Sequence, residues 1–168
     1  DAKEKLAELE SLAHHTLKEM RLMLDHLRNA TSNQPVNFSE LVRNKCEEFS
    51  NRAGPEGGAL LAIRLDISED IIVYQTIANE ALWVLAEALQ NVIRHSDGRN
   101  VVVQVFCADY LQVQVMDDGT GFEIYSVSAG HYGLRGMRER VLALGGELNL
   151  QSSVGQGTIV SYKIPLPR

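Results

Sequence analysis

The sequence predicts an α+β fold, namely an α/β two-layer sandwich preceded by a long helix. The sandwich has a mixed, mostly antiparallel five-stranded sheet with three helices on one face. Apolar residues recur every three or four positions in the long segments, which is typical of helices. Shorter runs rich in apolar and β-branched residues are bounded by turn-forming residues, which is typical of strands. With 168 residues, 45% of them hydrophobic, the chain is long enough for one ordinary domain and a short extension.

The first helix is predicted over residues 3–29. Its apolar residues form one stripe: Leu6, Leu9, Ala13, Leu17, Met20, Leu24 and Leu27. This near-heptad spacing favours packing against another helix, which we expect to come from another chain, from a segment outside these residues, or from both. Because the chain starts at Asp1 and carries no signal-peptide pattern, we expect it to be a piece of a longer protein.

A polar linker over residues 30–36 separates this helix from the rest. Asn37, with Glu40 three positions later, is typical of a capping box and predicts the start of a second helix. That helix is expected to end near residue 53, before Gly54 and Pro55. The remaining predicted elements are a strand over 59–66, a helix from about 69 to 95, a hairpin of strands 101–107 and 111–116, a loop over 117–132, a helix over 133–144, and strands over 147–152 and 158–164.

Charge and cysteine content exclude some classes of function. The formal net charge of −6 argues against a dedicated nucleic-acid or anionic-membrane surface, either of which needs a basic face. The most apolar stretch, residues 71–93, contains Glu80 and Glu87, so it is not predicted to cross a membrane. Cys46 and Cys107 lie in unrelated contexts and predict free intracellular thiols.

Four segments stand out as candidates for a ligand-binding site. Glu87, Asn91, Arg94 and His95 share one face of the predicted long helix, although a solvated polar face has the same pattern. Residues 117–122 (Asp-Asp-Gly-Thr-Gly-Phe) directly follow a strand, and the two glycines allow a ligand to approach closely; a plain Asp-Gly turn is the alternative.

The third and fourth segments are also rich in glycine. Residues 133–137 (Gly-Leu-Arg-Gly-Met) start a predicted helix, where free N–H groups attract anions. A glycine inside the first turn costs about 1 kcal/mol against alanine, so it needs a reason. Residues 155–158 (Gly-Gln-Gly-Thr), taken alone, predict only a hairpin turn.

In this order, the four segments resemble the ATP-binding domain of sensor histidine kinases, of the GHKL (Bergerat-fold) superfamily. Residues 87–95 look like the asparagine box and residues 117–122 like the first glycine box. Residues 131–140 resemble the second glycine box in the form typical of the nitrate-sensor and desaturase-regulator kinases, and residues 155–158 match the last box. The resemblance covers the chain from about residue 38 to its end.

The resemblance implies a role for each matching residue. Asp117 would bind the adenine amino group, with Gly119 and Gly121 closing the backbone on the base and Thr158 supporting the pocket. Asn91 would ligate Mg²⁺, and Glu87 would be the catalytic carboxylate that holds a water or helps to activate the acceptor histidine. The residues implied in phosphate contact or lid closure are Arg94, His95, Gly133, Leu134 and Gly136. The resemblance leaves the role of Asp118 open.

The implied function is presentation of Mg·ATP for phosphoryl transfer to a histidine outside this chain and then to a response regulator. Residues 1–30 would be the second helix of a dimerisation and phosphoacceptor hairpin, and residues 36–168 the ATP-binding domain. The parent protein would be a cytoplasmic or membrane-anchored homodimer, with no membrane contact in this part. The alternatives are a GHKL-type ATPase, an anti-sigma serine kinase, or a non-catalytic module with a degenerate nucleotide site.

Overall fold

The computed structural model describes residue 20 and residues 34–51, 61–68, 70–123 and 132–167. The chain divides into two compact units, Asp1–Gln34 and Pro35–Arg168. The predicted first helix lies outside the described residues except for Met20, and so do residues 124–131 of the predicted loop over 117–132. The second unit contains all the other predicted elements.

A five-stranded sheet forms one layer of the second unit. Its strands, in spatial order, are β2 (Ala62–Ile67), β4 (Asn100–Cys107), β5 (Tyr110–Asp117), β7 (Thr158–Pro165) and β6 (Glu147–Ser152). β2 runs parallel to β4, and the other neighbouring strands are antiparallel. The prediction of a mixed, mostly antiparallel five-stranded sheet is confirmed.

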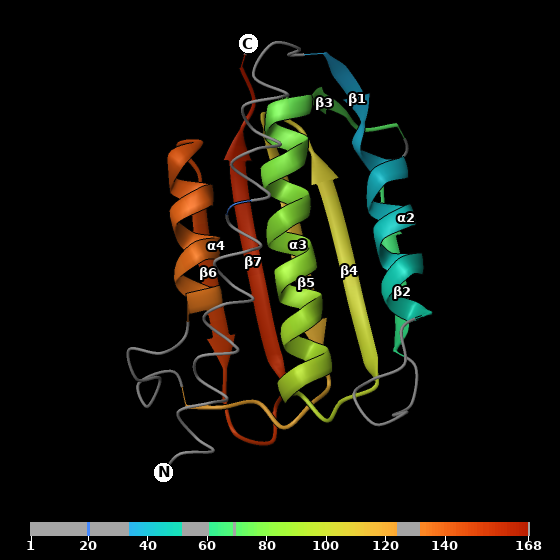
Figure 1. Ribbon diagram of the computed structural model, residues 1–168, viewed down its shortest axis with the longest axis vertical. Coiled ribbons are helices and arrows are strands. Elements are labelled where there is room, and N and C mark those ends of the chain that lie inside the picture. The colour runs from blue at the N-terminus through green and yellow to red at the C-terminus, as the bar shows by residue number, and fades with distance from the viewer. Residues whose placement is uncertain (1–19, 21–33, 52–60, 69, 124–131, 168) are drawn as a thin grey trace. The chain divides into compact units, whose positions relative to one another are not determined.

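Three helices cover one face of this sheet: α2 (Phe38–Ser50), α3 (Gln75–His95) and α4 (Tyr132–Ala143), with α3 in the middle (Figure 1). Buried and accessible residues alternate along the strands, which explains why the helices cover only one face of the sheet. Val101, Val103 and Val105 of β4 are fully buried beneath the helices, whereas the residues between them are partly accessible on the other face. The hydrophobic core therefore lies between the sheet and the helices.

A short second sheet corrects two sequence predictions. β1 (Pro35–Asn37) pairs with β3 (Ile72–Tyr74), so the predicted linker ends at residue 34 and the long helix begins at Gln75 instead of near residue 69. Proline is tolerated at the first residue of a strand, and the β-branched Ile72 and Val73 favour extended backbone. Val73 is buried, and this burial outweighs the helical pattern that continues toward it from α3.

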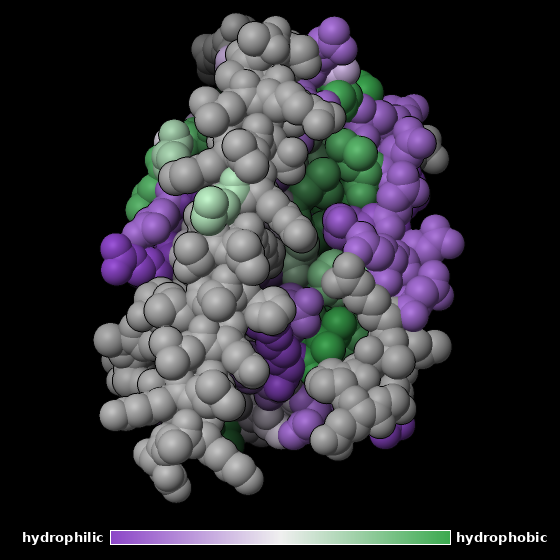
Figure 2. Space-filling view, viewed as in Figure 1, coloured by the Kyte–Doolittle hydropathy of each residue, from purple (hydrophilic) through white to green (hydrophobic). Residues whose placement is uncertain are grey.

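The start of α2 matches the predicted cap. The Asn37 side chain accepts a hydrogen bond from the Glu40 backbone N–H at 3.1 Å. The helix ends at Ser50, three residues before the predicted end. Hydrophilic side chains gather over α2 (Figure 2), where Glu40, Arg43 and Glu47 are exposed.

Packing of α3 on the sheet places its last turns at one edge of the core. Ala81, Leu85 and Leu89 are fully buried on the side of α3 that meets the strands. The buried Tyr162 hydroxyl of β7 donates a 2.6 Å hydrogen bond to the Ala81 carbonyl. This bond links the middle of the helix to an inner strand of the sheet.

The described residues also bear on the cysteines and on membrane crossing. Cys46 and Cys107 are free thiols, and burial raises the pKa of Cys46 to about 12, so its thiol stays protonated near neutral pH. Among the helices formed by the described residues, none is both long and apolar enough to cross a membrane.

Candidate functional site

The last three turns of α3 carry the polar residues predicted from the sequence. Glu87 is buried, Asn91 is half-buried, and Arg94 and His95 are exposed. The α4 residue Gly133 lies against Glu87, because a Cβ atom built on Gly133 would be only 2.5 Å from Glu87 Oε1. A side chain at residue 133 would therefore displace the Glu87 carboxylate. The structure brings the asparagine box and the start of α4 together.

Ser96, which follows His95 at the end of α3, joins the helix to the first glycine loop. Its hydroxyl accepts a hydrogen bond from the Gly98 N–H at 2.9 Å, and its carbonyl accepts one from the Thr120 N–H at 2.7 Å. A Cβ atom on Gly119 would overlap both the carbonyl and the hydroxyl of Ser96. Gly119 is thus required for the loop to close on the helix. Sequence reasoning missed Ser96, because a small residue after a helix carries no specific signal.

Asp117 ends β5 at the centre of this region. One carboxylate oxygen, Oδ1, accepts a hydrogen bond from the Gly119 N–H at 2.9 Å, which folds the loop back toward the strand. Asp117 lies opposite Thr158 in the β5–β7 pairing. Gly157 has a φ of 71°, and a Cβ atom there would overlap the Asp117 carbonyl. The first and last glycine boxes therefore meet at Asp117.

Ser152 closes the same junction from β6, and sequence reasoning missed it as well. Its hydroxyl accepts from the Phe122 N–H at 2.9 Å and donates to the Gly157 carbonyl at 3.0 Å. The Thr158 hydroxyl lies 3.0 Å away. The single hydrogen of the Ser152 hydroxyl is donated to the Gly157 carbonyl, so the Thr158 hydroxyl is the donor to Ser152. Ser152 links residues of two boxes that are more than thirty positions apart in the sequence.

The structure gives Asp118 a structural role, which the sequence left open. Its carboxylate accepts hydrogen bonds from the Asn100 side chain at 2.6 Å and from the Asn100 and Arg99 backbone N–H groups at 3.0 Å. These bonds, led by the one from the Asn100 side chain, lower the pKa of the Asp118 carboxyl. The exposed Asp118 thus fastens the first glycine loop to the start of β4.

Gly136 has a packing role in this structure. A Cβ atom on Gly136 would lie 3.2 Å from the edge of the Trp83 ring of α3. The glycine therefore lets α4 approach α3 closely, which explains why the helix accepts the unfavourable propensity of glycine. Leu134 is half-buried in the first turn of α4.

The backbone N–H groups at the start of α4 and the side chains near them suit a nucleotide phosphate chain with one metal ion. The first N–H groups of an α-helix have no partners within the helix, and α4 begins beside Glu87. Within the described residues, no group of three or more His, Cys, Asp or Glu side chains could hold a metal ion alone. One amide oxygen, such as that of Asn91, fits Mg²⁺, which keeps several waters and takes its other ligands from substrate phosphates.

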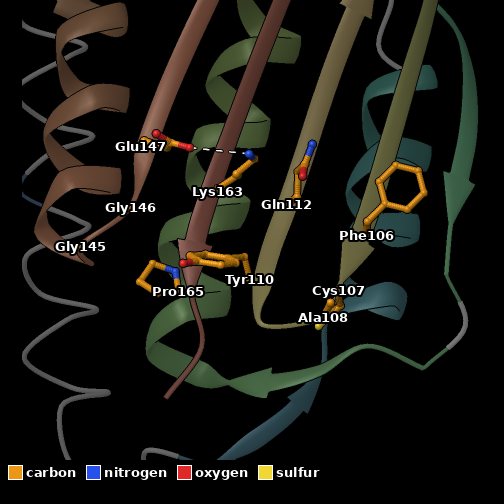
Figure 3. A pocket seen from close by; sticks show the side chains of 10 residues that line it. All are labelled: Phe106, Cys107, Ala108, Tyr110, Gln112, Gly145, Gly146, Glu147, Lys163 and Pro165. Atoms are coloured by element: carbon orange, nitrogen blue, oxygen red, sulfur yellow. Dashed lines mark ion pairs between the residues drawn. The ribbon is translucent and has the colours of Figure 1, made fainter. Parts of the chain in front are cut away.

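A separate pocket of about 670 Å³ lies on the face of the sheet away from the helices (Figure 3). Phe106, Gln112, Lys163 and Glu147 form one row across neighbouring strands, and Lys163 and Glu147 pair at 3.7 Å. The pocket lies by the β4–β5 turn, at the opposite end of β5 from Asp117. It contains none of the predicted site residues.

The fold and the four boxes define an ATP-binding domain of the GHKL type. The sequence profile described as "Histidine kinase-, DNA gyrase B-, and HSP90-like ATPase" matches residues 77–168. This match covers more than half of the chain, and the chain belongs to that family.

Its relatives are sensor kinases. The chain is 31% identical over 159 residues to the sensor histidine kinase LiaS of Bacillus subtilis, covering 94% of this chain and 42% of LiaS. It is 26% identical to the histidine kinase domain of the Erythrobacter litoralis EL346 blue-light activated histidine kinase, with a TM-score of 0.57 over 77% of this chain and 59% of that one. The ATP-binding domain of PrrB from Mycobacterium tuberculosis shares the fold, with a TM-score of 0.64, 18% identity and coverage of 80% of this chain and 98% of that one. These relatives do not favour the ATPase or serine kinase alternatives.

Proposed function

We propose that this chain is the catalytic domain of a sensor histidine kinase, which presents Mg·ATP for transfer of the γ-phosphoryl group to a histidine outside these residues. Two contacts support the proposal: Gly133 of the second glycine box lies against Glu87, and Asp117 of the first glycine box lies opposite Thr158 of the last. Because the chain spans 42% of LiaS, the acceptor histidine and the whole protein's partners belong to the proposal.

Asp117 would recognise adenine. One of its oxygens already accepts from the Gly119 N–H, and the carboxylate would accept a further hydrogen bond from the adenine amino group. Gly119 and Gly121 keep the loop close to the base, and Thr158 supports the pocket from the facing strand. Selectivity for adenine over guanine would follow, because guanine has a carbonyl oxygen, an acceptor, in place of the adenine amino group.

Asn91 and Glu87 would act at the phosphate end. Asn91 would give one oxygen to Mg²⁺, which would neutralise charge on the phosphates. Glu87 would hold a water or orient the incoming histidine, and its burial restricts it to few positions. The exposed Arg94 and His95 would contact phosphate oxygens, and Gly133, Leu134 and Gly136 would position the backbone of α4 over them.

The remaining assignments concern the parent protein. Residues 1–30 would be the second helix of a dimerisation hairpin, so that the parent is a homodimer, and the phosphoryl group would pass on to a response regulator. The domain would work in the cytoplasm without contacting nucleic acid or membrane, which agrees with its net charge of −6.

Calorimetric titration of Asp117→Asn with Mg·ATP tests this function. The amide oxygen can still accept from the Gly119 N–H, so the fold should persist, while the amide nitrogen would oppose the adenine amino group. We expect ATP affinity to fall by about tenfold to a hundredfold. Asp109→Asn, at the opposite end of β5, is the matched control and should bind as the wild type does. Wild-type affinity in a folded Asp117→Asn variant would contradict the adenine assignment.

A further inference from the structure

A buried cluster of side chains joins α4 to α3, about two turns along both helices from the contact of Gly133 with Glu87. Arg140 Nη1 of α4 lies 2.9 Å from Glu80 Oε2 of α3, and both side chains are at least 85% buried. The Arg140 guanidinium carbon also lies 4.2 Å from the centroid of the Trp83 ring. We refer to Arg140, Glu80 and Trp83 as the Arg140 cluster.

The cluster is part of a regular alignment of two antiparallel helices. Glu87 lies against Gly133, Trp83 against Gly136, and Glu80 against Arg140. Each helix advances seven residues, about two turns or 10 Å, between the first and the last of these contacts. A shift of α4 along α3 would therefore change all three contacts together, including the approach of Gly133 to Glu87.

We propose that Arg140 is a positioning residue that fixes the place of α4 along α3, and through it the place of Gly133 beside Glu87. This inference rests on the proposed function, because it assigns a nucleotide-binding role to the start of α4. A shift of α4 by one turn would leave two buried charges without their counter-charges, which is strongly unfavourable. The flat guanidinium pairs with Glu80 and stacks on Trp83 at once, and a lysine could not reproduce this geometry.

The structure contains a probe for this contact. Trp83 is the only tryptophan of the chain, and it lies between Gly136 and the Arg140 guanidinium. Indole fluorescence depends on nearby charge and water, so its emission reports the surroundings of Trp83, with or without nucleotide. The emission is therefore a measurement independent of ATP affinity.

The test compares Arg140→Gln with Arg138→Gln, which changes an exposed arginine on the same helix. At a temperature where every variant is folded, we expect Arg140→Gln to bind Mg·ATP about tenfold more weakly and to shift Trp83 emission. Arg138→Gln should match the wild type in both measurements. Arg140→Lys keeps a counter-charge for Glu80 and should recover part of the affinity. Unchanged affinity and unchanged emission in folded Arg140→Gln would overturn the proposal, even if the variant unfolds more easily.

A double variant covers the case in which Arg140→Gln does not fold. Glu80→Gln combined with Arg140→Gln leaves no uncompensated buried charge, and its two amides can still form a hydrogen bond. The positioning role predicts weaker ATP binding and altered Trp83 emission in this variant as well, and wild-type values would overturn it. If the wild type itself fails to bind ATP, the proposed function fails, whereas amide hydrogen exchange in α4 of the nucleotide-free variants still decides whether Arg140 holds that helix in place.

Discussion

At the scale of single residues, two serine side chains organise the loops around Asp117. Ser96 holds the first glycine loop to the end of α3, and Ser152 joins that loop to the last glycine box. Each serine bonds to backbone groups that have no regular strand or helix partner. The loops are thus held in place by neighbours within the fold, as a preorganised ligand site requires.

The Asn91→Ala variant tests whether Asn91 contributes to Mg²⁺ binding or to nucleotide binding in general. If Asn91 supplies an oxygen to Mg²⁺, the variant should lose most of the gain in ATP affinity that Mg²⁺ provides, while metal-free ATP binding changes little. Titrations with Mg²⁺ and with excess chelator measure the two affinities. Gln90→Ala, a change to a similar amide on the preceding residue, should behave as the wild type does. An equal loss in both titrations would make Asn91 a structural residue.

Asp118 should make the stability of the domain dependent on acid pH. Its carboxyl has a lowered pKa in the folded state, so its contribution is fully present above the unfolded-state pKa of about 4 and is lost as pH falls through the folded-state value. Asp118→Asn should destabilise the domain near neutral pH and flatten the decline in acid. Urea unfolding between neutral pH and pH 3 measures this. Parallel pH profiles for wild type and variant would contradict the assignment.

At the scale of elements, the bond from Tyr162 to α3 connects the sheet to the helix that carries Glu87. Tyr162→Phe keeps the ring and removes the 2.6 Å hydrogen bond to the Ala81 carbonyl. We expect the free energy of unfolding to fall by about 1 kcal/mol, since a buried hydrogen bond typically contributes about that much net. Urea denaturation gives the value. Tyr110→Phe, at an exposed position on β5, is the control and should change stability little.

Most elements could be predicted because their signals are local. The cap at Asn37, the hairpin of β4 and β5 and the strand β6 follow from turn residues and alternation within short windows. The start of α3 could not be predicted as well, because Ile72 becomes a strand residue only through pairing with Asn37, which lies far away in the sequence.

In the candidate site, too, residues with local sequence signals could be predicted, and residues defined by contacts between distant segments could not. Glu87, Asn91, Asp117 and the glycines stand in recognisable local motifs. The contacts of Ser96, Ser152 and Arg140 depend on which loops and helices meet, and each residue alone has an ordinary surface or turn pattern. The sequence therefore indicates the residues that we propose to face the ligand better than the residues that hold them in place.

At the scale of the whole molecule, we expect this chain to bind ATP without labelling itself. The family resemblance implies an acceptor histidine followed by an acidic residue, and His14, His15 and His26 are followed by His, Thr and Leu. Positioning of a nucleophile is worth about 7–11 kcal/mol of the barrier, so an unpositioned histidine should not react at a measurable rate. Labelled ATP with Mg²⁺ and an alkaline quench, which preserves phosphohistidine, is the assay.

The control for that assay adds a separate helical hairpin that carries a His-Asp pair. Label on the added hairpin alone would support transfer to an outside acceptor. Stoichiometric label on this chain would show that one of its own histidines is the acceptor, and the assignment of residues 1–30 would be wrong.

The place of β7 between β5 and β6 has a consequence during synthesis on the ribosome. Asp117 leaves the exit tunnel forty residues before Gly157, which is about 2–8 s at ordinary rates of translation. Throughout that interval β5 has one edge without its neighbour, and nascent chains nearby could pair with it. Arrival of β7 closes that edge and completes the surroundings of Asp117 in one step. A product released before residue 158 would therefore combine an exposed strand edge with incomplete surroundings for Asp117.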